Sequence, residues 1–346
     1  MSTMPEKITG GVDTHLDVHV AAALNSLGAL LGVASFEASA RGYRMLLRWL
    51  QGFGTVELVG VEGTGSYGAG LTQHLRGQGV AVVEVDRPNR QKRRLRGKSD
   101  PVDAIAAARA AQSGEATGEA KSRDGNVEVI RVLRLVKLSA RKDRTRALNQ
   151  MHSIVCTAPE PLRAELRGLT NFRLIERALS YRSGGKRDIE STTKTALRHL
   201  ARRVQFLEAQ IAEVDEVVAP LVEATAPQLL AQNGVGIDTA AALLVAAGDN
   251  PERLGSERSF AHLCGVAPLD ASSGKQQRHR LSRGGDRQAN QALWRVVMTR
   301  ISYDPRTRVY IHRRTKEGLT KREAMRCLKR YVARELYAHL PRPIVA

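Results

Sequence analysis

The first 112 residues alternate between short apolar runs and helical segments, and this order limits the fold more than any other feature of the chain. The predicted strands are three short ones within 8–36, then 55–61 and 80–85. The predicted helices are 40–52, 66–77 and 101–112. Three strands followed by alternating helices and strands are typical of a mixed α/β domain.

Four acidic residues stand at the ends of these predicted elements. Asp13 lies in GVDTH on the first strand, Glu62 lies in VEGTGSYG where a later strand ends, and Asp100 and Asp103 lie in KSDPVDA at a helix start. The spacing of three puts the last two carboxylates on one helix face. Two charges about 4 Å apart interact by roughly 4 kcal/mol at an effective dielectric of 20. Divalent cations would offset that repulsion, and oxygen ligands suit Mg²⁺ or Mn²⁺, which can clamp a phosphodiester.

Each of these acids also has a purely structural interpretation. A lone Asp on a strand is usually a turn or edge charge. Asp100 before Pro101 is a plausible helix N-cap, and Asp103 would then favour the helix dipole. These interpretations stay open when the residues are considered one at a time.

The charge of the chain points to a polyanionic partner. Lys and Arg number 54 against 35 Asp and Glu, a formal net charge of +19, with a pI near 10.4. Nucleic acid is the expected partner, and an anionic membrane surface is the competing interpretation. The basic stretch 87–98 holds seven cations and no acid: Arg87, Arg90, Lys92, Arg93, Arg94, Arg96 and Lys98. It lacks interleaved aromatics, so it favours contact with the phosphate backbone, or else it is a solvated loop.

No transmembrane or secreted class fits the sequence. The stretch 18–36 is apolar, but polar residues and Gly28 interrupt it, so a β-hairpin explains it better than a membrane helix. The polar start MSTMPEKITGG is unlike a signal peptide. Cys156, Cys264 and Cys327 are far apart and form no CxxC pair, which indicates reduced thiols. We expect a bacterial cytoplasmic protein associated with the nucleoid.

The middle of the chain, from about 124 to 225, has a helical pattern. Apolar residues recur there at alternating steps of three and four: Leu197, Leu200, Val204, Leu207, Ile211, Val214, Val218 and Leu221. A heptad seam of this length predicts a coiled coil or a long helical hairpin. One amphipathic helix packed inside its own domain is the alternative.

The last third contains two informative stretches. NGVGIDTAAALL (233–244) resembles a helix-hairpin-helix element, whose glycines would let backbone N–H groups approach a phosphate, although an ordinary turn between helices is possible. Within the stretch 265–297, small residues come first and cations come after them, among them Lys275, Arg278, Arg280 and Arg283. A serine there would need a base or nearby cations to become a nucleophile, and most Ser-Gly loops are solvated turns.

GVDTH, VEGTGSYG and KSDPVDA together resemble the Asp, Glu, Asp, Asp set of the RNase H-like (RuvC-like) domain in one transposase family. That family is the bridge-RNA-guided insertion-sequence recombinases, related to Piv-type DNA invertases, and the similarity extends past residue 226. The resemblance implies that Asp13, Glu62, Asp100 and Asp103 are catalytic and bind Mg²⁺ (or Mn²⁺) beside the scissile phosphate. It also implies that Ser273, with Ser272 as its rival, becomes covalently linked to DNA.

The resemblance implies three regions: 1–116 RNase H-like, 117–225 helical coiled-coil for dimerisation, and 226–346 a mostly helical transposase domain with the helix-hairpin-helix-like element. Its implied partners are DNA (element ends and target), a guide non-coding RNA and further copies of the chain, as a dimer or tetramer. Its implied reaction is strand exchange through a phosphoserine. Two other functions stay open: a metal-dependent nuclease or junction resolvase that needs no serine, and a non-catalytic nucleic-acid-binding protein.

Overall fold

The computed structural model describes residues 6–85, 99–182, 188–274, 279–280, 282 and 284–341. These residues form two compact units. Among the described residues, unit 1 contains the chain up to Arg123 together with Asn250–Gly255, and unit 2 contains Asp124–Asp249 and the described residues from Ser256 to Pro341.

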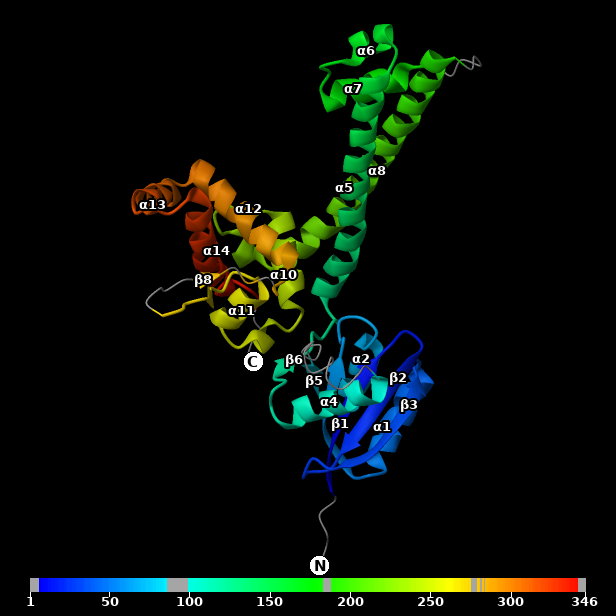
Figure 1. The fold of residues 1–346 in the computed structure, drawn as a ribbon, viewed down its shortest axis with the longest axis vertical. Helices are drawn as coiled ribbons and strands as arrows, with labels where there is room; N and C mark the ends of the chain where they lie inside the picture. Colours follow the sequence, from blue (N-terminus) through cyan, green and yellow to red (C-terminus); the bar gives the residue numbers. More distant parts are fainter. Residues whose placement is uncertain are drawn as a thin grey trace, which may run out of the picture. The chain divides into compact units, whose positions relative to one another are not determined.

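Unit 1 is built on a six-stranded sheet of order β3-β2-β1-β4-β5-β6 (Figure 1). Its strands are β1 (Lys7–Thr14), β2 (Val18–Leu24), β3 (Leu30–Glu37), β4 (Thr55–Glu62), β5 (Ala81–Val85) and β6 (Gly118–Glu119). The first three strands pair antiparallel, whereas β4 pairs parallel to β1 and β5 parallel to β4. The predicted strands are therefore confirmed, and the apolar stretch 18–36 is a β-hairpin, as expected.

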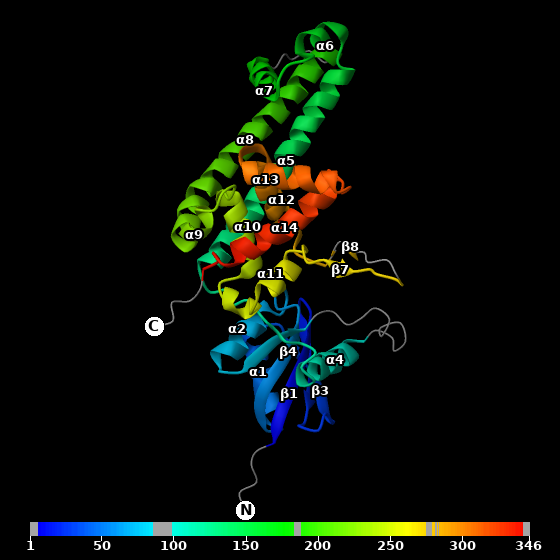
Figure 2. The same cartoon turned by 90° about the vertical axis from the view of Figure 1, so that its left-hand side faces the viewer.

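Helices cover both faces of this sheet: α1 (Ala40–Gln51), α2 (Ala69–Gly77) and α4 (Asp100–Gln112). Side chains alternate along a strand, and Ala21 and Ala23 belong to the core under α1 and α2, whereas Val20 and Ala22 pack with Ala104 of α4. Figure 2 shows α1 and α2 on one side of the sheet and α4 on the other. The mixed α/β fold is as predicted, and its strand order is consistent with an RNase H-like domain.

Two boundaries differ from the sequence prediction. The helix expected from residue 66 begins at Ala69, because the glycine-rich segment after β4 forms turns, with Gly63 at a φ of 70°. The helix near 100 begins after Ser99, which occupies the N-cap position, so the alternative that Asp100 caps this helix is wrong.

The helical part of unit 2 begins with two long helices that pack side by side, α5 (Asn126–Thr157) and α8 (Ile189–Thr225). Two short helices lie at the tip of this hairpin, α6 (Glu160–Leu166) and α7 (Asn171–Ser180) (Figure 1). The heptad seam of α8 is buried at Leu197, Val204 and Val218, and its first part packs on Met151 of α5. This arrangement fits the long helical hairpin, and a coiled coil between copies of the chain stays a prediction.

The rest of unit 2 is mostly helical. Its elements are α9 (Pro227–Leu230), α10 (Ile237–Ala247), α11 (Glu257–Leu263), β7 (Leu269–Asp270), β8 (His279–Arg280), α12 (Arg287–Tyr303), α13 (Pro305–Lys316) and α14 (Lys321–Tyr337). The 3₁₀ helix η1 (Pro251–Leu254) belongs to unit 1. The first helix of the expected helix-hairpin-helix is the single turn α9, so that element stays a prediction.

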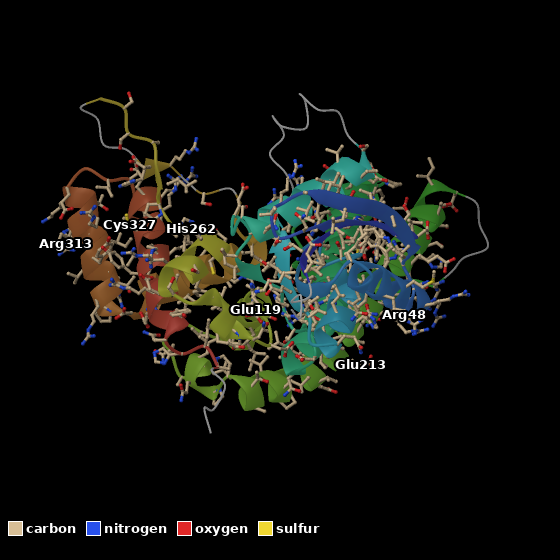
Figure 3. The ribbon with its side chains drawn as sticks, turned by 90° about the horizontal axis from the view of Figure 1, so that it is seen from below. Arg48, Glu119, Glu213, His262, Arg313 and Cys327 are labelled. Carbon is tan, nitrogen blue, oxygen red and sulfur yellow. The ribbon has the colours of Figure 1, made fainter. Side chains whose placement is uncertain are left out.

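Two sequence expectations concern the setting of the chain. None of the helices in the described ranges is long and apolar enough to cross a membrane. The three cysteines form no disulfide: Cys156 is exposed, Cys264 is buried, and Cys327, labelled in Figure 3, is half-buried on α14.

Candidate active site

Asp13 is a buried carboxylate near the end of the central strand β1. Its neighbour Val12 belongs to the core under α1 and α2, so strand alternation directs Asp13 to the opposite face, where α4 packs. Asp13 pairs with Val20 on the antiparallel strand β2. The position of this carboxylate is therefore fixed by its own strand β1 and by the pairing of that strand with β2.

Helix α4 approaches the sheet closely because small residues meet at the contact. A Cβ added to Gly11 of β1 would lie 2.1 Å from the backbone N of Ala108 and 2.3 Å from the backbone O of Ala104. A Cβ added to Gly60 of β4 would lie 2.6 Å from the backbone O of Ala107. Glycine on the strands and alanine on the helix therefore set the separation at which the aspartates of α4 face Asp13.

This packing brings three metal-ligating side chains together. One ligand atom each from Asp13, His15 and Asp100 lies within 4.8 Å of the other two. The Nε2 atom of His15 is 3.2 Å from Oδ2 of Asp13 and 3.5 Å from Oδ1 of Asp100. We call Asp13, His15 and Asp100 the carboxylate–histidine cluster.

His15 is a site residue that the sequence reasoning missed. It stands two positions after Asp13 in the same GVDTH motif, so the signal was present in the spacing. Its side chain is 42% exposed, which leaves the cluster open to solvent. The cluster is thus accessible to an ion or a substrate, although Asp13 itself is buried.

The cluster carries an electrostatic cost. Burial raises the pKa of Asp13, and the negative charges of Asp103 and Asp100 raise it further, while the charge and hydrogen bond of His15 lower it. A cation at this position would offset that cost, because it favours the ionised carboxylates. The donor set of two carboxylates, one of them buried, and one imidazole fits a divalent metal.

The other two predicted acids lie beside the cluster. Asp103 is buried in the first turn of α4, and its charge acts on Asp13. Glu62 is the last residue of β4 and follows Val61, which pairs with Val12, so it ends its strand next to Asp13. The Thr14 hydroxyl donates a hydrogen bond of 2.7 Å to the backbone O of Glu62 and joins the two strand ends. Neither carboxylate is within the 4.8 Å group.

The predicted nucleophile lies in unit 2. Leu269 pairs with Arg280 and Asp270 pairs with His279, so the small-residue loop connects two short antiparallel strands. Ser273 is exposed, and Gly274 follows it with a φ of 57°.

The neighbouring serine has a partner within this hairpin. The hydroxyl of Ser272 donates to the carboxylate of Asp270, and its backbone N donates to the same oxygen at 2.9 Å. In the part of the chain that the structure describes, we find no hydrogen-bond partner for the hydroxyl of Ser273. The two candidate serines therefore differ in what their hydroxyls contact.

Most of the predicted nucleic-acid-binding cations fall outside the described residues. These are the seven of the 87–98 stretch, together with Lys275, Arg278 and Arg283. Arg280 is described, and it is exposed on β8.

Comparison with known proteins finds similarity to transposases in two segments of the chain. Residues 10–158 match a family model described as a transposase, of the DEDD type found in IS110 elements. Residues 226–312 match the model of the "Transposase IS116/IS110/IS902 family". Both matched segments are therefore similar to transposases of the IS110/IS116 family of insertion elements.

Two curated proteins of insertion elements are also similar to this chain. The chain is 36% identical over 146 residues to the "Insertion element IS110 uncharacterized 43.6 kDa protein" of Streptomyces coelicolor, covering 41% of this chain and 33% of the relative. It is 27% identical over 149 residues to the "Insertion element IS900 uncharacterized 42 kDa protein" of Mycobacterium paratuberculosis, covering 42% and 37%. The chain thus aligns with about a third of the length of each relative.

Proposed function

We propose that this chain is the recombinase of its insertion element and that it cuts and exchanges DNA strands under the guidance of an RNA from that element. The observation that carries the catalytic part is the carboxylate–histidine cluster, which joins β1 to the start of α4 in a sheet of RNase H-like order. The similarity of two segments to transposases supports DNA as the substrate.

In this proposal the cluster holds a divalent cation, Mg²⁺ or Mn²⁺. Asp13 and Asp100 supply carboxylate oxygens, and Glu62 and Asp103 complete the acid set from the adjacent strand end and helix turn. A bound divalent cation would orient a phosphodiester and neutralise the charge that develops on it. His15 contacts both carboxylates and holds them in place from the solvent side.

Ser273 is the proposed nucleophile. Its Oγ attacks the phosphorus, a phosphoserine bond forms, and one strand leaves with a free hydroxyl. A hydroxyl of the second DNA then attacks the phosphoserine, which restores Ser273 and joins the strands. The hydroxyl of Ser272 already donates to Asp270, whereas that of Ser273 has no hydrogen-bond partner among the described residues, and this difference supports the choice of Ser273. Each phosphodiester bond is exchanged for another, so no nucleotide triphosphate is needed.

The remaining partners follow from charge and helix surface. The net charge of +19 and the basic stretch 87–98 support binding of both DNA and a guide RNA. We propose a dimer or tetramer, with the α5–α8 hairpin as its contact. Val129, Val132 and Val136 of α5 are exposed at helical spacing, which supports self-association along this helix.

The test is detection of the covalent intermediate. The full chain is incubated with the DNA ends of its element, the flanking non-coding RNA and Mg²⁺, then denatured, and the DNA-linked residue is mapped by mass spectrometry. We expect an adduct on Ser273 that Ser273→Ala abolishes and Ser272→Ala retains. Asp13→Ala should abolish cleavage and leave binding intact, whereas the exposed Asp17→Ala serves as the matched control. Full strand transfer by Asp13→Ala would refute the metal assignment.

A two-metal nuclease or junction resolvase is the second candidate. The acid cluster would suffice for hydrolysis, and that reaction needs no serine. DNA cleavage without any protein adduct, unchanged by Ser273→Ala, would favour this function.

A further inference from the structure

Helix α12 of unit 2 carries a tryptophan on the face that points away from its core. The buried residues of this helix are Ala289, Ala292, Leu293, Val296, Val297 and Arg300. The opposite face consists of Arg287, Gln288, Gln291, Trp294, Arg295, Met298 and Thr299. Trp294 is 44% exposed in the middle of this outer face. The only other tryptophan, Trp49, packs edge-on against Phe53 in unit 1.

Trp294 forms a wall common to two hollows. One, of about 530 Å³, lies between the outer face of α12 and the turn 234–236. The other, of about 500 Å³, lies between the same face and the glycines Gly265 and Gly285, and Lys329 also lines it. Both hollows are large enough for a small planar group. An indole with open space on both sides is suited to stacking.

Cationic side chains line both hollows beside the indole. Arg295 lines the first hollow, and Arg287 lines the second. Arg295 also lines a small adjoining recess with Arg134, Lys137 and Arg141, whose one acidic lining residue among those described is Asp238.

The guanidinium groups of this recess repel one another. Burial lowers the pKa of Arg134, and the like charges of Arg295 and Arg141 lower it further, while Asp238 and Asp286 oppose the shift. Lys137 is held by Asp238 and Asp215. An anionic ligand beside Arg295 would offset the repulsion, and a phosphate is such a ligand.

We propose that the outer face of α12 binds an unpaired DNA strand, with one base stacked on Trp294 and the flanking phosphates on Arg295 and Arg287. Aromatic stacking combined with a cationic groove is the usual chemistry of single-strand binding. The proposal rests on the proposed function, because strand exchange requires DNA ends that are not base-paired. DNA is chosen over RNA because the same unit carries Ser273, to which that function assigns attack on DNA.

The first experiment reads Trp294 directly. In the full-length Trp49→Phe variant Trp294 is the only tryptophan, and its fluorescence is followed in EDTA on addition of DNA. We expect a single-stranded oligonucleotide to quench it and an abasic strand of equal length to quench it weakly, because only bases stack. Equal quenching by the abasic strand, or none by either strand, would overturn the proposal. RNA of the same sequence that binds more than about tenfold tighter than DNA would overturn the choice of partner.

The second experiment compares substitutions by filter binding. Trp294→Leu should weaken single-strand binding by about 5- to 100-fold, the worth of one stacked base, whereas Trp294→Phe retains most of it. Trp294→Leu should leave binding of the abasic strand unchanged, and Arg295→Gln should weaken both. Tyr303→Leu is the matched control, since Tyr303 is 78% exposed at the end of the same helix.

Wild-type affinity in Trp294→Leu, or an equal loss in Tyr303→Leu, would exclude the stacking role. The thermal unfolding of each variant shows whether it folds. If Trp294→Leu does not fold, the binding affinity of Trp294→Phe and the quenching assay still test the stacking role. These assays contain no metal, and Asp13→Ala should bind like the wild type. Failure of catalysis with intact quenching would therefore count against the proposed function alone.

Discussion

Replacing Gly11 by alanine should separate the two halves of the candidate active site without touching any of its side chains. The added Cβ would meet the backbone N of Ala108 at 2.1 Å, where ordinary contact begins near 3.4 Å, so α4 must retreat by about 1.3 Å. The obstacle is backbone, which cannot rotate away as a flexible side chain can. Overpacking of this kind costs about 1–3 kcal/mol. A displacement of about 1 Å at the cluster can reduce a reaction rate about 10²-fold.

The assay measures three quantities on the full chain: the midpoint of thermal unfolding, the affinity for Mn²⁺ by calorimetry, and the rate of DNA cleavage. Gly77→Ala is the matched control, because its added Cβ would meet nothing within 4 Å and its backbone is helical. We expect Gly77→Ala to equal or slightly exceed the wild type in stability. If Gly11→Ala unfolds at the wild-type midpoint and binds Mn²⁺ with unchanged affinity, the close helix contact does not position the aspartates.

Three further predictions follow from single side chains. Asp13→Asn should abolish DNA cleavage, and it should abolish the rise in the unfolding midpoint on adding Mg²⁺. In EDTA this variant should unfold at no lower temperature than the wild type, because burial and like charges disfavour the ionised carboxylate of Asp13. A lower unfolding midpoint in EDTA would contradict this reasoning. Asp238→Asn should destabilise the chain by about 1–3 kcal/mol at neutral pH, measured by urea unfolding, because its lysine and arginine partners lose a charged acceptor. Burial alone would raise the pKa of Asp238, but its hydrogen bond to Lys137 and its cationic partners hold that pKa below its ordinary value. The stability that this group adds to the wild type is therefore lost as the pH falls below about 4, and the difference from Asp238→Asn should close there. Trp294→Leu should lower strand exchange more than it lowers cleavage of a single end, in assays that score the two products separately.

The sequence was a good guide to unit 1 because its signals there are local. Strand alternation and glycine-rich turns predicted the strands, and Asp13 and Asp100 could be predicted to meet because both stand at element ends. The GVDTH motif contained His15 as well, but a histidine on a strand is common, and only the tertiary contact with Asp100 distinguishes it. Helix–sheet separation is not a local property, so the role of Gly11 could not be predicted from the motif.

Unit 2 was harder to predict because its signals have two solutions. The same heptad seam fits a coiled coil between chains and a hairpin within one chain, and hydrophobic spacing cannot distinguish them. In the structure the seam is buried at Val204 by packing that includes α5 of the same chain. The position of Trp294 is a similar case. A tryptophan among the hydrophobic residues of a helix is usually expected in the core, and its outward position here depends on which face of α12 the other helices cover.

The contact between α4 and the sheet explains how a domain can hold repelling carboxylates together. The buried apolar residues of this helix are all alanines, Ala104, Ala107, Ala108 and Ala111, so the apolar area gained per residue is small. Close backbone approach at Gly11 and Gly60 gives a tight interface that tolerates little adjustment. The carboxylates that this interface brings together repel one another, and their repulsion opposes the docking of α4. A cation bound by the folded state alone would add RT ln(1 + [cation]/Kd) to the stability of unit 1. Metal binding and the docking of α4 are therefore thermodynamically linked, and each should strengthen the other.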